Sequence, residues 1–177
     1  MRIIAGTHKG HRIEAPKGRT TRPTSDRVRE NVFNLVAPWV EDAEVLDLFA
    51  GSGAMGIEAL SRGAARAVFV EGDTEACRTI NHNLDKLRLT GAQVLCQDVA
   101  RFIAQETRTY DVIFCDPPYE EYAHLAPALA RRAPRLLAPD GLLVLETSSR
   151  DPEPELPLTQ RTSRRYGAAR ITLFQRP

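Results

Sequence analysis

The chain is poor in the features that mark secreted, membrane-bound and metal-binding proteins. Its three cysteines, Cys77, Cys96 and Cys115, are widely spaced and form no CxxC motif. We interpret them as reduced core residues and expect no metal site. The chain has no apolar run of about eighteen residues, which excludes a membrane-spanning helix, and its N-terminus lacks the apolar stretch of a secretory signal peptide. These absences predict a cytoplasmic protein with no membrane partner.

The positive and negative charges are unevenly distributed along the 177 residues. Residues 1–36 and residues 156–177 each carry a net charge of +5, whereas the whole chain carries +1 and its middle therefore carries −9. Basic ends that flank an acidic body indicate a surface facing a polyanion. Charge alone leaves open the alternative that the arginine-rich ends are merely solvated. With 42% hydrophobic residues, the chain is long enough to build a globular core.

The first third of the chain predicts a small basic extension followed by a helix. Residues 2–15 have the pattern of a short hairpin turning at Gly6–Gly10, and 17–21 form a basic loop. A helix is expected from Thr24 or Ser25, which can cap it, to Pro38, with an inward stripe of Val28, Val32, Leu35 and Val36. We hypothesise that residues 1–21 are a basic extension outside the sheet that docks a nucleic acid, and that 22–177 form the main domain. The alternative is that Ile3, Ile4 and Ile13 pack on the core.

From residue 44 the sequence alternates between apolar strands and amphipathic helices. Strands are expected at 45–49, 67–71, 93–96, 110–115 and 142–146, and helices at 54–61, 74–89, 99–105 and 122–137. Residues 158–166 and 170–175 predict a closing antiparallel hairpin around Gly167. Strands that are apolar throughout imply a parallel sheet covered on both faces. The predicted fold is therefore a doubly wound α/β domain with a mostly parallel seven-stranded sheet.

A glycine-rich turn follows the first of these strands. The segment from Val45 to Gly56 reads VLDLFAGSGAMG, which joins strand, tight turn and helix and lets backbone amides approach a cofactor. The residues expected to bind the cofactor here are Asp47, Phe49, Gly51, Ser52 and Gly53. The spacing also fits a dinucleotide site, so an NAD-dependent oxidoreductase is an alternative, as is a turn that binds nothing. Asp47 argues against the dinucleotide, because it would repel a pyrophosphate and suits a cationic amino-acid group.

Two further acids follow the next strands. Glu71 ends the second strand, where its carboxylate could accept hydrogen bonds from both hydroxyls of a ribose; the alternative is a surface acid that caps the next helix. Asp98, followed by Val99, ends the third strand and could accept from an adenine amino group, cap the next helix, or do both. Strand ends at the point where the strand order reverses are where open α/β sheets bind ligands.

The tetrapeptide Asp116-Pro117-Pro118-Tyr119 ends the fourth strand and carries the most specific chemistry. Consecutive prolines stiffen the backbone. The Asp116 carboxylate and the Pro117 carbonyl can then accept hydrogen bonds from one planar NH2 group and orient its lone pair. Tyr119 offers an aromatic face on which a flipped base can stack. The alternative, a strand end with no further role, is disfavoured by its position after a cofactor turn.

These motifs resemble those of class I S-adenosylmethionine-dependent methyltransferases, which have a Rossmann-like fold. The DPPY tetrapeptide is similar to the motif of enzymes that methylate amines, and Tyr119 stands where 5-methylcytosine enzymes of DPPC type have a cysteine. The N-terminal MRIIAG with GHR, the RPT-DRVRE segment from Arg22 to Glu30, and the hairpin from Arg164 to Leu173 resemble the RsmD-type family over essentially the whole chain. That family methylates N2 of one guanine (the 966-type position) of 16S ribosomal RNA.

The resemblance implies a cofactor, a substrate and a mechanism. S-Adenosylmethionine would be the methyl donor, and 16S rRNA, free or within an assembling 30S subunit, would be the partner of a monomeric enzyme. Positioning would supply most of the acceleration, with Asp116 as an orienting acceptor. A DNA or RNA adenine-N6 methyltransferase shares the DPPY chemistry, whereas a protein-amine methyltransferase leaves the basic ends unexplained, and a non-catalytic RNA-binding module needs no cofactor turn. The residues expected to contact RNA are Tyr119 and six others, Arg2, Arg12, Arg22, Thr24, Arg27 and Arg165.

Overall fold

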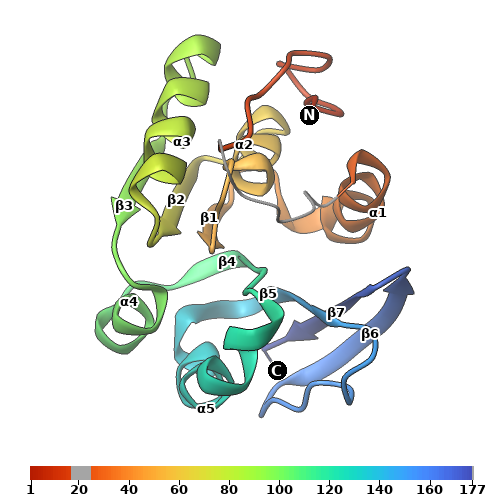
Figure 1. Ribbon diagram of the computed structural model, residues 1–177. Coiled ribbons are helices and arrows are strands. Elements are labelled where there is room, and N and C mark those ends of the chain that lie inside the picture. The colour runs from red at the N-terminus through yellow and green to blue at the C-terminus, as the bar shows by residue number, and fades with distance from the viewer. Residues whose placement is uncertain (17–24, 177) are drawn as a thin grey trace.

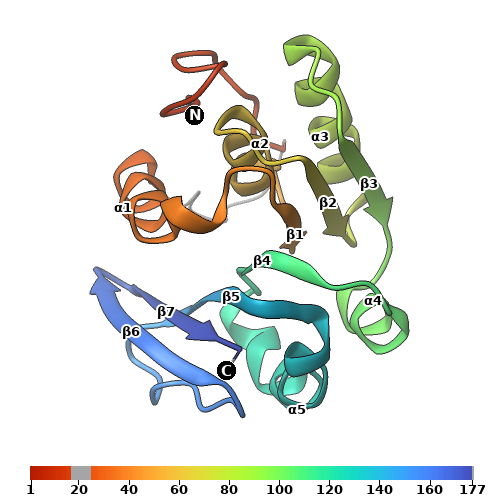
Figure 2. The same ribbon diagram turned by 180° about the vertical axis from the view of Figure 1, so that it is seen from behind.

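The strand–helix pattern folds into one twisted sheet with helices on both faces, as Figures 1 and 2 show. The computed structural model describes residues 1–16 and 25–176. Its seven strands lie in the order β3-β2-β1-β4-β5-β7-β6. The strands β1 to β5 are parallel, and β7 is antiparallel to both β5 and β6. The predicted doubly wound, mostly parallel seven-stranded sheet with a C-terminal antiparallel hairpin is therefore confirmed.

The predicted elements are present, with small shifts at their ends. The strands are β1 (Glu44–Leu48), β2 (Arg66–Glu71), β3 (Ala92–Cys96), β4 (Tyr110–Cys115), β5 (Leu137–Ser148), β6 (Thr159–Tyr166) and β7 (Ala169–Gln175). The helices are α1 (Asp26–Val36), the short 3-10 helix η1 (Ala37–Trp39), α2 (Ala54–Ser61), α3 (Thr74–Leu87), α4 (Val99–Gln105) and α5 (Tyr119–Leu136). Within residues 1–16 and 25–176, every helix is too short or too polar to cross a bilayer.

The two faces of the sheet bury two separate hydrophobic cores, because successive side chains of a strand point to opposite faces. In β4, Val112 and Phe114 pack with α1, α2 and α3, whereas Ile113 and Cys115 pack with α4 and α5. The same alternation runs through β1, β2 and β5. The α1–α3 face is the one that carries the candidate functional residues described below.

Two details of burial differ from the expectations. In α1, which Ser25 caps at the Val28 amide, the predicted stripe is confirmed, because Val32 and Val36 are buried and Val28 and Leu35 pack half-buried against the same core. Phe33 and Arg29 are buried as well, so the buried face of α1 is wider than the predicted stripe. The expectation that all three cysteines lie in the core is wrong for one of them. Cys96 is exposed, because β3 is an edge strand, while Cys77 and Cys115 are buried and all three are free.

The other shifts concern α5 and β5. The helix α5 begins at Tyr119, three residues before the predicted start, since Pro118 already has the fixed φ that suits a helix N-cap. The strand β5 extends from Leu137 through the predicted turn at 139–141, because a register shift against β4 absorbs these residues.

The N-terminal segment lies outside the sheet and packs on α2. An isolated bridge joins Arg2 to Arg12 in place of a full hairpin ladder. Ile3 and Ile13 are 2% and 4% exposed and belong to the core, whereas Ile4 is half-buried. The packing alternative therefore holds for Ile3 and Ile13, and a role of this segment in docking RNA stays a prediction. The predicted basic loop at 17–21 lies outside the described residues.

Candidate active site

A single cleft of about 830 Å³ opens at the carboxyl ends of the central strands and gathers most of the predicted site residues. Its lining includes eleven of them, from four successive parts of the chain: Asp47, Phe49, Gly51, Ser52, Glu71, Asp98, Val99, Asp116, Pro117, Pro118 and Tyr119. Gly53 shapes the turn without lining the cleft. Four of the predicted RNA-contacting residues, Arg2, Arg12, Arg27 and Arg165, lie outside the lining. Arg22 and Thr24 lie outside the described residues.

The turn after β1 has a backbone conformation that residues other than glycine rarely adopt. Gly53 has a φ of +80° and is the N-cap of α2, and Phe49 at the strand end has a φ of +58°. A non-glycine residue held at positive φ stores about 1–3 kcal/mol of strain, and such residues cluster at ligand sites. Gly56 serves packing instead: a Cβ there would lie 2.3 Å from the Phe69 ring, so α2 can lie this close to β2 only without a side chain.

Asp47 is buried at the centre of the site. It is 3% exposed, and its Oδ2 accepts a hydrogen bond from the Gly56 amide at 2.9 Å, which ties β1 to the first turn of α2. Burial raises the pKa of Asp47 to about 8, against the lowering effect of the Gly56 bond, and the nearby Asp116 and Glu71 raise it further. A carboxylate in such surroundings favours a cation beside it.

Glu71 braces the turn from the neighbouring strand. Its Oε2 accepts from the Gly51 amide and its Oε1 from the Asp73 amide, both at 2.9 Å. It is 3% exposed, and Asp73 caps α3 at the Ala76 amide, so the alternative of Glu71 as a surface helix cap is wrong. A carboxylate has about four acceptor positions, so it can accept several hydrogen bonds at once.

Asp98 has the local role that the sequence offered as one of its two alternatives. Its Oδ1 accepts from the Arg101 amide at 2.7 Å and caps α4. It also lines the cleft, next to the buried Val99. Capping therefore holds, and the second alternative, acceptance from an adenine amino group, stays a prediction that this position permits.

The DPPY segment forms the opposite wall of the cleft. Pro117 is buried, whereas the Asp116 side chain is exposed to the cleft. Among the described residues, Tyr119 is the one large hydrophobic residue that is exposed, at 42%. Its hydroxyl donates to the Ala168 carbonyl at 3.4 Å, and burial together with Glu146 raises its pKa to about 12. Tyr119 is therefore neutral at physiological pH and offers an uncharged ring at the mouth of the cleft.

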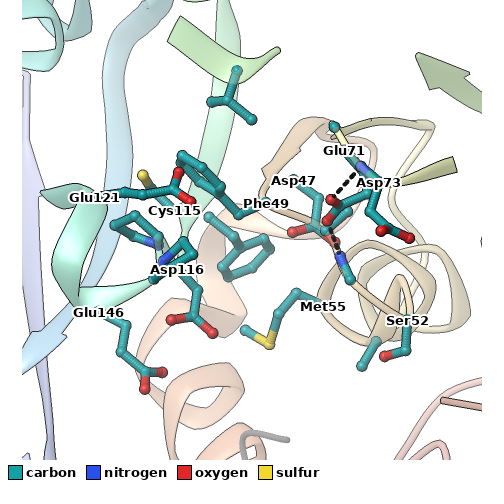
Figure 3. A pocket seen from close by; sticks show the side chains of 18 of the residues that line it. Asp47, Phe49, Ser52, Met55, Glu71, Asp73, Cys115, Asp116, Glu121 and Glu146 are labelled. Carbon is teal, nitrogen blue, oxygen red and sulfur yellow. Dashed lines mark hydrogen bonds between the residues drawn. The ribbon is translucent and has the colours of Figure 1, made fainter. Parts of the chain in front are cut away.

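The cleft is strongly acidic. Among the described residues, its lining holds eight carboxylates and no lysine, arginine or histidine. Figure 3 shows Asp116 and Glu146 on one side of the pocket and Asp47, Glu71 and Asp73 on the other. Such a cleft attracts a cationic ligand and repels the pyrophosphate of a dinucleotide, which counts against the oxidoreductase alternative.

Sequence reasoning missed several lining residues. Met1 and Met55 line the cleft, as do Asp73, Glu121 and Glu146. Asp73 could have been found from its place after β2, next to Glu71. Glu146 could have been found as the residue that ends the apolar run of β5. No local signal marks Met1, which reaches the cleft only because the N-terminal segment packs on α2.

The fold and the site together define a class I methyltransferase, the class that takes its methyl group from S-adenosylmethionine. The acidic cleft and the glycine turn fit this donor, since its sulfonium and ammonium groups are cationic. A family model described as "Conserved hypothetical protein 95" matches residues 1–175, so the chain belongs to this family.

Named relatives and solved structures agree with this placement. The chain is 38% identical over 185 residues to "Putative rRNA methyltransferase YlbH" of Bacillus subtilis, with 99% of both chains covered. It is 43% identical over 119 residues to "Ribosomal RNA small subunit methyltransferase D" of Escherichia coli, which covers 67% of this chain and 60% of that protein. The structure of "Putative methyltransferase yhhF" of Escherichia coli superposes with a TM-score of 0.87 at 35% identity, covering 99% and 97% of the two chains.

Proposed function

We propose that this protein transfers a methyl group from S-adenosylmethionine to the exocyclic N2 amine of a guanine, at the 966-type position, in 16S ribosomal RNA. The observation that carries the proposal is the pairing of two walls in one cleft. The glycine turn with Asp47 and Glu71 lies on one side, and the DPPY segment lies on the other. The names of the relatives support rRNA as the substrate.

The donor, when bound, supplies an electrophilic methyl group and a neutral leaving group. The residues of this chain hold and orient it. Asp47 would face its cationic amino-acid part, Glu71 would accept from its ribose hydroxyls, and Asp98 would accept from its adenine amine. Each of these carboxylates is already fixed by a backbone amide, so little ordering remains for binding to cost.

On the other wall, Asp116 and Pro117 act on the substrate amine. The Asp116 carboxylate and the Pro117 carbonyl oxygen would each accept a hydrogen bond from one N–H of the NH2 group. Together they would orient its nitrogen toward the methyl carbon. The Asp116 charge also stabilises the positive charge that develops on nitrogen during transfer. Tyr119 would stack on the flipped base, an interaction of about 1–3 kcal/mol. The proton leaves after transfer, so no strong base is required beforehand.

The basic residues suit the RNA backbone outside the cleft. In both views the N-terminal segment, α1 and the β6–β7 hairpin lie on the side of the molecule away from β3 and α4 (Figures 1 and 2). Arg2, Arg12, Arg27 and Arg165 belong to these elements. Phosphates would bind this side while a single base enters the acidic cleft, since the cleft itself repels polyanions.

The test is methyl transfer from labelled donor to three substrates: undermethylated 30S subunits, free 16S rRNA and DNA. Digestion to nucleosides then identifies the modified base. N2-methylguanosine in rRNA is the expected product, and Asp116→Ala should slow its formation by roughly 10²-fold. N6-methyladenosine as the product would favour the adenine-N6 alternative, whose amine the DPPY wall could also orient.

A further inference from the structure

Glu146 lies beside Asp116 on the neighbouring strand. Cys115 of β4 pairs with Leu145 of β5, so Asp116 and Glu146 are the next residues along two adjacent parallel strands. Neighbouring strands are about 4.8 Å apart. Phe114 and Val144, two residues earlier on each strand, both point to the α1–α3 face and line the cleft. The alternation of the strands thus directs both carboxylates into the same cleft, where Figure 3 shows them together.

Glu146 is also close to the residue proposed to stack on the base. Its carboxylate is near enough to the Tyr119 hydroxyl to contribute to the raised pKa of that phenol. A carboxylate has two oxygens and about four acceptor positions, so it can accept hydrogen bonds from more than one donor at once. A base stacked on Tyr119 would therefore have two adjacent carboxylates, Asp116 and Glu146, beside one edge.

Two adjacent carboxylates match the Watson–Crick edge of guanine better than that of adenine. Guanine presents two neighbouring donors on its Watson–Crick edge, the N2 amine and the N1–H group. Adenine presents one amine next to N1, which is an acceptor. An ionised carboxylate is an acceptor only, so it would pair with N1 of guanine and repel N1 of adenine. A buried polar group left unpaired discriminates strongly against the wrong substrate.

We infer that Glu146 is a specificity-determining residue, which accepts a hydrogen bond from N1–H of the target guanine while Asp116 accepts from N2. The inference rests on the proposed guanine-N2 function. Glu146 would make the enzyme prefer guanine over a base that carries the same amine without the N1 proton. 2-Aminopurine is such a base, because it has the 2-amino group and an unprotonated N1.

The experiment compares guanine with 2-aminopurine at the target position. A 16S rRNA carrying either base is assembled by splinted ligation and offered both free and in reconstituted 30S subunits. The wild type is expected to prefer guanine by 10²-fold or more in kcat/KM. In Glu146→Gln this preference should fall at least 10-fold, because the glutamine NH2 can donate to N1 of 2-aminopurine. The affinity for S-adenosylmethionine should stay within 2-fold.

The matched control is Glu155→Gln, which removes the same charge from an exposed loop residue outside the cleft. It should keep the wild-type preference. If Glu146→Gln slows both substrates equally, Glu146 acts only through its charge and the inference is overturned. An unchanged preference overturns it as well, while N2-guanine methylation by the wild type would still stand. A wild type that methylates no guanine in any substrate would remove the proposed function and the inference together.

Discussion

The Glu58 carboxylate binds the backbone of the N-terminal segment. This residue of α2 is 1% exposed, and its carboxylate accepts from the Ile4 amide at 2.8 Å and from the Ala5 amide at 3.0 Å. Arg62 donates to the same carboxylate at 2.8 Å, and the equally buried Arg29 lies 3.8 Å away. Glu58→Gln keeps the volume but removes the charge and turns an NH2 group toward donors.

The expected cost follows from these contacts. Removing one partner of a buried ion pair costs about 3–5 kcal/mol, because the remaining charge is left uncompensated. Each backbone amide left without an acceptor costs about 1–3 kcal/mol. These contributions belong to one network and do not add, so we expect a total loss of about 3–5 kcal/mol. For a protein of this size, that lowers the Tm by roughly 6–20 °C.

Urea unfolding followed by circular dichroism measures the change in the free energy of unfolding. The matched control is Glu75→Gln on α3, whose partner Arg78 is a solvent-exposed arginine; the two side chains are 62% and 72% exposed. The control should change stability by no more than about 0.5 kcal/mol. A loss below about 1 kcal/mol in Glu58→Gln would refute the view that this carboxylate holds the N-terminal segment in place.

Three further predictions concern the cofactor, the chemistry and the RNA. The pKa of Asp47 is raised to about 8 in the folded protein. The unliganded fold therefore loses stability as the pH rises from about 4 to 8, because the buried carboxyl must ionise. A cationic ligand should bind more tightly as the pH rises through the same window. Calorimetry in two buffers should detect proton release on binding S-adenosylmethionine at pH 7 that Asp47→Asn abolishes; an equal proton balance in both proteins would contradict this. Asp116→Ala should lower kcat by roughly 10²-fold while the donor affinity stays within 2-fold, and near-normal turnover would remove Asp116 from the amine site. Arg165→Ala should weaken RNA binding and reduce the slope of log affinity against log salt by about 1, whereas an unchanged slope would mean that Arg165 contacts no phosphate.

The parts of the site that could be predicted are those with a local signature. The glycine turn and the DPPY segment each lie at a junction of strand and loop, where a few consecutive residues determine the backbone. Asp47, Glu71 and Asp116 could be placed because parallel strands bring their carboxyl ends to one edge. Ser25 and Asp98 could be assigned as caps because capping depends on residues three positions apart.

Burial of charged residues could not be predicted in this way. Arg29 and Glu58 have the pattern of exposed helix residues in sequence. They are buried because a segment more than twenty positions earlier in the chain covers α2 and places its amides against Glu58. Nothing in the residues around Glu58 indicates that contact.

The sequence by itself therefore determined the elements, their order along the chain and the two motifs expected to hold donor and amine, because hydrophobic periodicity, caps and turns act over a few residues. The tertiary structure decided which side chains meet. The strand order β3-β2-β1-β4-β5-β7-β6 places β4 beside β5 and so brings Glu146 next to Asp116. The same order leaves β3 at the edge, which exposes Cys96. Strand order depends on long-range pairing, and no local pattern encodes it.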